Sequence, residues 1–230
     1  MENTKKWVIT ADNTPIISDF TITKLSQQVE FSTSYLVLMS MSGLLAAIAL
    51  LNNSIPILIG SMIIAPAFAP LSLVAFALVG GKPRLAMRGL GVALAGLFMA
   101  MLLAMATTWL LKFSHILPPE INLMEKPLLD ERVNPGWYSI AVAISAGVAG
   151  TIAQVRDKID TLVGAVAAVA LVPAAAAAAI AFISHAPHLG IGGLELLAIN
   201  ISSIIFAGVL TILVMGPERE MSKELSPEED

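Results

Sequence analysis

Long stretches without a charged residue are the feature that most limits what this chain can fold into. They cover residues 31–81, 89–111, 133–155, 161–194 and 196–217. A helix that crosses a bilayer needs about 20 consecutive apolar residues. The first stretch contains Asn52-Asn53-Ser54 at its middle, so we divide it into two spans joined by a tight turn. The other four stretches hold one span each, which predicts six transmembrane helices.

The composition agrees with a membrane protein. Hydrophobic residues make up 57% of the chain and charged residues 13%, and the mean hydropathy is +0.82, whereas soluble domains carry about 25% charged residues. The expected fold class is therefore all-α, a polytopic membrane protein with six transmembrane helices. We expect these helices at residues 34–51, 55–79, 89–111, 138–155, 161–183 and 194–215.

The chain divides into three parts. Residues 1–30 are expected to form a short cytoplasmic segment, residues 31–217 the six-helix transmembrane domain, and residues 218–230 an acidic, disordered tail. In the first part, the spacing of Ile22, Leu25 and Val29 suits a helix that continues into the first span.

Lysine and arginine residues predict the orientation, because they favour the cytoplasmic side of a membrane. With six spans, both ends of the chain and the second and fourth loops share one side. Ten of the 13 basic residues lie there, and Lys112, Lys126 and Arg132 are the other three. We therefore expect a multi-pass protein of the cell inner membrane with both termini in the cytoplasm.

Two of the expected spans contain a glycine followed by proline. The first reads from Gly60-Ser61 to Pro66 and Pro70, and the second from Gly164 to Pro173. Proline in a helix removes a hydrogen bond and clashes with a carbonyl one turn earlier. In lipid, a break of this kind must be buried in protein or line a cavity. A matching pair of interrupted segments in two halves of a chain indicates a transporter-type site.

The loop at residues 112–135 separates two sets of three helices. A repeat of three helices must be inverted in the membrane, so an inverted 3+3 repeat with broken helices 2 and 5 is one interpretation. The other is that both segments are kinked helices that pack through small residues, since proline is more frequent in spanning helices than in soluble ones.

Polar side chains within the spans are few and neutral. Asn200 in the last span is the strongest single candidate, because an amide in lipid costs free energy unless it is hydrogen-bonded; the alternative is a structural bond between helices. The only carboxylate within the expected spans is Glu195, at the outer edge of the last one. The absence of a carboxylate at the bilayer centre favours an anionic or neutral polar solute over carboxylate-coupled ions. The candidate pathway residues are Gly60, Ser61, Pro66, Pro70, Gly164, Pro173 and Asn200.

The chain resembles a family of hydrophobic prokaryotic membrane proteins known as domain of unknown function 389. The resemblance covers residues 36 to 214. It rests on Asn53, residues 59–66 with Pro70, Gly80 with Lys82-Pro83-Arg84, Asn134-Pro135, residues 145–150, Gly164, residues 167–173 and Asn200. It differs in having Ala174 where the family usually has a second proline. The resemblance implies a polytopic helical membrane fold and supplies no activity.

No enzyme motif is present. The chain lacks the zinc-protease, serine-hydrolase and phosphate-binding patterns, and it contains no cysteine. His115, His185 and His188 are expected on the outer side, where scattered loop histidines are a commoner case than a metal site. We therefore expect no enzymatic activity, no cofactor, no metal and no nucleic-acid partner.

These observations predict a transporter or channel for a small polar or anionic solute or ion. The alternative is a non-transporting membrane scaffold or sensor subunit that assembles through alanine-rich helix faces. In both cases the expected partners are the lipid bilayer and further copies of the chain, in a homo-oligomer.

Overall fold

The computed structural model describes residues 19–115, 126–134, 136–155 and 161–215, and all the regular structure in these residues is helical. The helices, in chain order, are α1 (Asp19–Gln28), α2 (Thr33–Leu51), α3 (Ile55–Ile64), α4 (Phe68–Val79), α5 (Pro83–Phe113), α6 (Pro127–Val133), α7 (Trp137–Val155), α8 (Thr161–Ile183) and α9 (Pro187–Met215). The predicted acidic tail at residues 218–230 lies outside the described residues.

Three of the long helices, α2, α7 and α8, begin and end within one residue of the predicted limits. α5 and α9 begin at residues 83 and 187, well before the predicted residues 89 and 194. Segment 55–79 is divided into α3 and α4, and the short helix α6 lies in the loop where no helix was predicted.

The prediction that the first helix continues into the first span is wrong. α1 ends at Gln28, and α2 begins anew at Thr33. Ser32 has an extended backbone, and its side chain accepts a hydrogen bond from the amide of Tyr35, 3.1 Å away. This is the usual geometry of a helix N-cap. α1 instead packs on α4, where Ile22 lies against Gly80.

Four helices of the described residues are long and apolar enough to cross a membrane: α2, α5, α7 and α9. The bent pair of α3 and α4 adds a fifth if it counts as one span. The protein is therefore a multi-pass membrane protein of helical fold.

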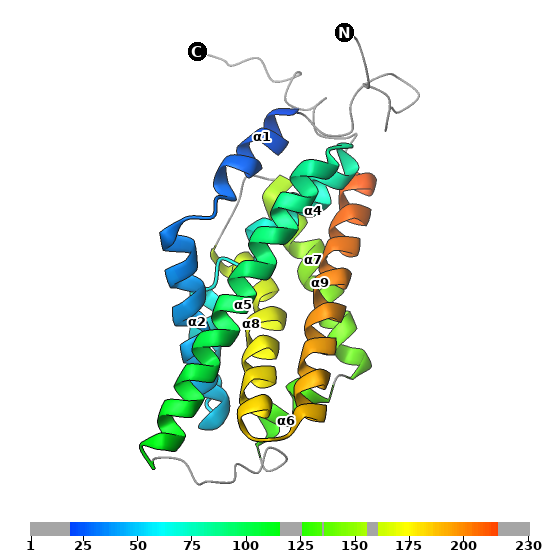
Figure 1. Cartoon of the computed structure of the whole chain (residues 1–230). Helices are drawn as coiled ribbons and strands as arrows, with labels where there is room; N and C mark the ends of the chain where they lie inside the picture. The colour runs from blue at the N-terminus through cyan, green and yellow to red at the C-terminus, as the bar shows by residue number, and fades with distance from the viewer. Residues whose placement is uncertain (1–18, 116–125, 135, 156–160, 216–230) are drawn as a thin grey trace.

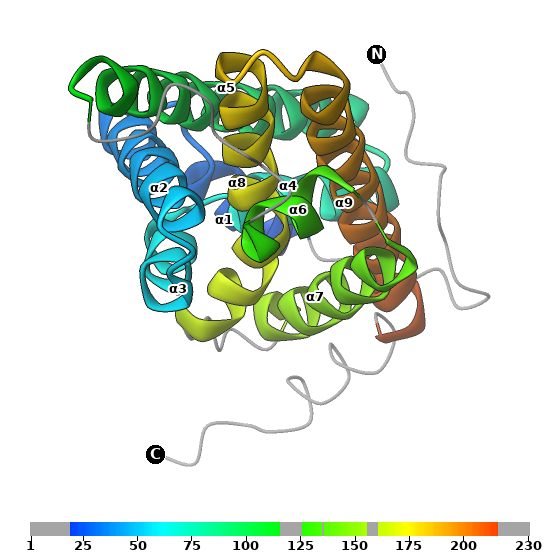
Figure 2. The same ribbon diagram turned by 90° about the horizontal axis from the view of Figure 1, so that it is seen from below.

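The centre of the bundle is α8. Figure 2 shows it enclosed by α2, α3, α5, α7 and α9, and α8 contacts each of these helices. All residues from Leu171 to Ala181 are buried. Alanine side chains allow this, since small residues let helix backbones approach closely; a Cβ on Gly193 of α9 would lie 3.0 Å from Ala178.

The two ends of the bundle differ. Figure 1 shows α1 and the carboxyl end of α9 at one end, and α6 with the turn between α8 and α9 at the other. α6 lies across its end of the bundle, over the centre (Figure 2). Its Leu129 and Val133 are buried, and it contacts α2, α8 and α9.

Candidate functional site

The candidate site is the break between α3 and α4. The axes of the two helices differ by 51°. Proline disfavours the helical conformation in the residue before it, and Ala65, which precedes Pro66, has an extended backbone with φ −73° and ψ 116°. Pro66 therefore ends α3 at Ile64, as the sequence predicts for this segment.

Pro70 lies in the first turn of α4 and does not interrupt that helix. The first amides of a helix have no partner within it, so the missing amide of a proline costs little there. No side chain caps α4 at Ala67. Among the described hydrogen bonds outside the helices, none is donated by the amides of Ala65 or Ala67. The break therefore brings together backbone groups that neither helix satisfies.

Ser42 and Ser61 complete one side of the break. The hydroxyl of Ser42 on α2 donates to the carbonyl oxygen of Ser61, 2.6 Å away, and this carbonyl belongs to the last turn of α3. The hydroxyl of Ser61 donates to the carbonyl oxygen of Leu58 at 2.7 Å. Both serines are fully buried. Thus the predicted site residue Ser61 ties α3 to α2 through its carbonyl, and its hydroxyl is engaged within α3.

Two glycines let neighbouring helices approach the start of α4. A Cβ on Gly89 of α5 would lie 2.8 Å from the carbonyl oxygen of Pro70, and a Cβ on Gly150 of α7 would clash with the ring of Phe68. The contact at Gly89 is with backbone and requires glycine, whereas a Cβ at Gly150 would require the ring of Phe68 to move. Sequence reasoning missed Gly89 and assigned Gly150 to general packing, because only the fold brings them to the break.

Gly60 differs from these glycines. It is half-buried, and an added Cβ would meet no atom within 4 Å. Packing therefore does not require glycine at this position. The open space beside Gly60 lies about one helical turn before the break.

The prediction of a second break is wrong. α8 runs without interruption from Thr161 to Ile183, and Pro173 lies inside it. A proline in a membrane helix is tolerated when neighbouring helices hold the freed backbone groups, and Pro173 is buried at the centre of the bundle. Gly164 is also in α8, but its surroundings lie outside the described residues.

The structure gathers part of the predicted site. Gly60, Ser61, Pro66 and Pro70 share the α3–α4 segment. Asn200 lies on α9 and is buried, on the helix face that also carries Leu196 and Ile204. α9 contacts both α4 and α8.

The surroundings of the break are apolar. Ala65, Ala67 and Phe68 belong to one core cluster with Leu171 and Val172 of α8. Residues 31–81 hold no ionisable acid or base other than Tyr35, so backbone amides, carbonyls and serine hydroxyls supply the polar chemistry. In the described part of the chain, no three histidine, aspartate or glutamate residues form a group that could hold a metal ion.

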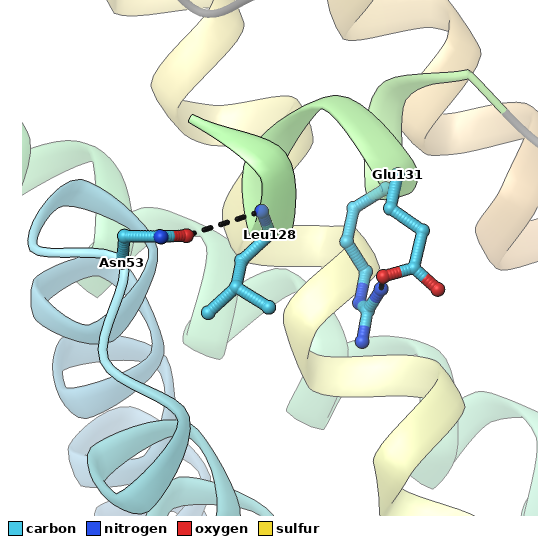
Figure 3. A network of polar contacts seen from close by, with 4 residues as sticks. Asn53, Leu128 and Glu131 are labelled. Carbon is cyan, nitrogen blue, oxygen red and sulfur yellow. Dashed lines mark hydrogen bonds and ion pairs between the residues drawn. The ribbon is translucent and has the colours of Figure 1, made fainter. Parts of the chain in front are cut away.

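A polar contact network fixes α6 on the end of the bundle. The ammonium group of Lys126 donates to the carbonyl oxygen of Leu51 at 2.5 Å, and the amide of Leu128 donates to Oδ1 of Asn53 at 3.2 Å (Figure 3). Arg132 pairs with the neighbouring Glu131 at 2.8 Å (Figure 3). The helical spacing of the apolar residues after Pro127 is the feature of the sequence that could have predicted this helix.

Lysines occupy the carboxyl ends of two helices on this side. Lys126 bonds the last turn of α2, and Lys112 donates to the carbonyl oxygen of Ile183 at the end of α8, 3.2 Å away. A cation is favourable at a helix carboxyl terminus, where unpaired carbonyls give a partial negative charge. Two of the three basic residues predicted on the outer side therefore act as helix caps.

Comparison with known proteins gives a family but no activity. Residues 62–206 match the family described as domain of unknown function 389. The chain is 25% identical over 139 residues to an uncharacterized protein of Methanocaldococcus jannaschii. The match covers 60% of this chain and 41% of that protein, so the chain spans about two-fifths of the relative's length. No solved structure matches it.

Proposed function

Because this chain belongs to the family described as domain of unknown function 389, whose description names no activity, we propose a function from the geometry of its own break. The protein passes a small polar or anionic solute or ion across the cell inner membrane, and the solute crosses at the break between α3 and α4. The single observation that carries this proposal is a bent span in which the amides of Ala65 and Ala67 donate no hydrogen bond to the described residues.

The depth of the break supports the proposal. α3 has 10 residues, and a rise of about 1.5 Å per residue gives it a length of about 15 Å. This is about half of the hydrocarbon thickness of a bilayer. Irregular backbone at such a depth is tolerated only where it is buried in protein or lines a water-filled cavity.

The chemistry at the break favours an anionic or neutral polar solute. The amino end of α4 carries amides without a partner in that helix and a partial positive charge, and the carboxyl end of α3 carries carbonyls without a partner in that helix. Residues 55–79 contain no carboxylate that would balance a cation. Discontinuous membrane helices use this pair of ends to hold solutes and ions in other transporters.

The proposed topology has six spans with both termini in the cytoplasm. The spans are α2, the pair α3 and α4, then α5, α7, α8 and α9. α8 has 23 residues, about 35 Å of helix, which is long enough to cross. That the first three and the last three spans form an inverted repeat stays a prediction. A matching pair of breaks does not support it, because α8 is continuous.

We propose no enzymatic role, cofactor or nucleic-acid partner. The proposed partners are the lipid bilayer, the solute and further copies of the chain in a homo-oligomer. The alanines of α8 are not the surface for this assembly, because Ala174 to Ala179 are all fully buried within one subunit.

The packed centre of the bundle favours a second candidate, a membrane scaffold or sensor subunit that transports nothing. The buried hydroxyls of Thr108 and Thr211 bond carbonyls of their own helices, and the buried stretch of α8 is apolar. These groups are engaged within the protein, as a scaffold would require.

Flux measurements in liposomes separate the two candidates. The purified protein is reconstituted, its folding is verified by circular dichroism, and uptake of a panel of small anions, neutral solutes and cations is compared with that of empty liposomes. Uptake of an anion or neutral solute above the background supports transport. If the folded protein moves no member of the panel, the scaffold is the better account.

A further inference from the structure

Two arginines lie near the start of α5, and the first of them, Arg84, is in the first turn, where a helix disfavours positive charge. Arg84 and Arg88 are four residues apart on the same face, and both are exposed. The first turn of α5 contains no acidic residue. Like charges at this spacing repel each other, and the amino end of a helix has a partial positive charge of its own.

No acid of the described residues forms an ion pair with either arginine. The general preference of cytoplasmic loops for basic residues would be met by charges anywhere in the turn. It does not explain two arginines stacked on one exposed helix face. Within the described residues no group balances these two charges, and an anion of the membrane would do so.

The depth of the arginines matches the headgroup layer. The charge-free part of α5 runs from residue 89 to residue 111, which is about 34 Å of helix and close to the hydrocarbon thickness of about 30 Å. Arg88 therefore lies at the boundary of the hydrocarbon. Arg84 lies about one turn beyond it, at the level of lipid phosphates.

The same helix face continues into the hydrocarbon as an apolar stripe. Met87 is 68% exposed, Leu94 48% and Phe98 56%. Between them lies Gly91, which is exposed and where a Cβ would meet no atom within 4 Å. From Arg84 to Phe98 these residues follow helical spacing and therefore share one face of α5. This face carries two cations, an exposed apolar surface, and a notch, which is the open space beside Gly91.

We propose that this face of α5 binds one anionic phospholipid of the inner membrane. The guanidinium groups of Arg84 and Arg88 bind its phosphate, since guanidinium groups bind phosphate oxygens in a bidentate manner. An acyl chain lies along Gly91, Leu94 and Phe98. The inference goes beyond the proposed function and does not depend on it, because the lipid binds whether or not a solute crosses.

Native mass spectrometry and lipid titration in a neutral detergent test the proposal. We expect the folded wild-type protein to bind phosphatidylglycerol in preference to phosphatidylcholine. Replacement of both arginines in Arg84→Gln/Arg88→Gln should weaken phosphatidylglycerol binding about 30-fold, given the usual contribution of basic residues at a membrane surface. Arg132→Gln, at the other end of the bundle, is the matched control and should change binding less than about twofold.

Two further variants keep the test decisive if the double variant fails to fold. Arg84→Lys/Arg88→Lys retains both charges and should bind with an intermediate affinity, because lysine lacks the bidentate geometry. Gly91→Phe fills the notch and should weaken lipid binding while leaving the charges in place.

Three results would overturn the proposal. They are equal binding of phosphatidylcholine, unchanged phosphatidylglycerol binding in the folded arginine variants, and full displacement of the lipid by inorganic phosphate at a matching concentration. The last result would mean that the two arginines bind a soluble anion. None of these results bears on solute flux, so a failure here is distinct from a failure of the proposed transport.

Discussion

The two proline-containing segments have similar sequences and different structures. Segment 55–79 is broken and bent by 51°, whereas α8 continues through Pro173. α3 lies at the side of the bundle, with exposed Ile59 and Ile63, and α4 is largely buried, while α8 lies at the centre (Figure 2). A proline in a membrane helix therefore does not by itself produce a break.

The number of prolines and their surroundings explain the difference. A continuous helix through residues 64–70 would lack the amides of both Pro66 and Pro70, whereas α8 lacks only the amide of Pro173. The residues around Pro173, from Leu171 to Ala181, are enclosed on all sides, so neighbouring helices hold the helical path in place. α3 has neighbours on one side only, and it can end where Pro66 requires.

Mending the break should have the largest effect. In Pro66→Ala/Pro70→Ala both amides return, and a continuous helix through this segment no longer carries the cost of about 3 kcal/mol that a proline inside a helix imposes. We expect solute flux in liposomes to fall at least about tenfold, a change of about 1.4 kcal/mol in the barrier, with no loss of thermal stability. Pro173→Ala is the control and should keep its flux within about twofold, because α8 is already continuous. Equal loss of flux in both would contradict the contrast drawn here.

A smaller effect is expected where α5 contacts the start of α4. In Gly89→Ala the new Cβ would lie 2.8 Å from the carbonyl of Pro70, and overpacking of this kind costs about 1–3 kcal/mol. Gly91→Ala, two residues along, meets open space and should stabilise the helix by up to about 1 kcal/mol. Thermal unfolding in detergent measures both. If the two variants unfold at the same temperature, α5 does not approach the break as described.

The serine bond between α2 and α3 should contribute less. Ser42→Ala removes the 2.6 Å hydrogen bond to the carbonyl of Ser61, and a typical bond of this type contributes about 1 kcal/mol to stability. Ser145→Ala removes only a bond within α7 at an exposed position and should change stability by less than about 0.5 kcal/mol. An equal effect of the two variants on the unfolding temperature would show that the contact does not fix α3.

The smallest effect on stability is expected at Gly60. Gly60→Ala meets no atom within 4 Å and improves helix propensity by up to about 1 kcal/mol. The unfolding temperature should therefore stay the same or rise slightly. A marked fall would mean that a neighbouring helix or a second subunit occupies the space beside Gly60.

Much of the fold could be predicted from the sequence because the bilayer restricts the possible structures. The charge-free stretches and the Asn52-Asn53-Ser54 turn located the long helices closely, since a span requires an apolar segment of a set length. α6 escaped prediction, because a seven-residue helix gives no comparable signal and is held by the distant partners Leu51 and Asn53.

The site could be predicted only in part. Pro66 and Pro70 marked the real break through a local effect on the backbone. Pro173 carried the same local signal, but its helix is held by neighbours that only the folded bundle brings together. The roles of Ser42, Gly89 and Gly150 also depend on contacts between helices that are distant in the sequence, and no periodicity reports them.

Thiol accessibility tests the central claim most directly, because the chain has no cysteine of its own. Gly60→Cys and Ala67→Cys probe the break while keeping both of its prolines, and Ile59→Cys and Val172→Cys probe the exposed face of α3 and the centre of the bundle. In membranes, a hydrophilic thiol reagent should modify the first two at least about tenfold faster than the last two, since a thiol reacts as a thiolate in water and stays protonated in an apolar environment. Equally slow modification of all four cysteines in folded protein would contradict an aqueous path at the break.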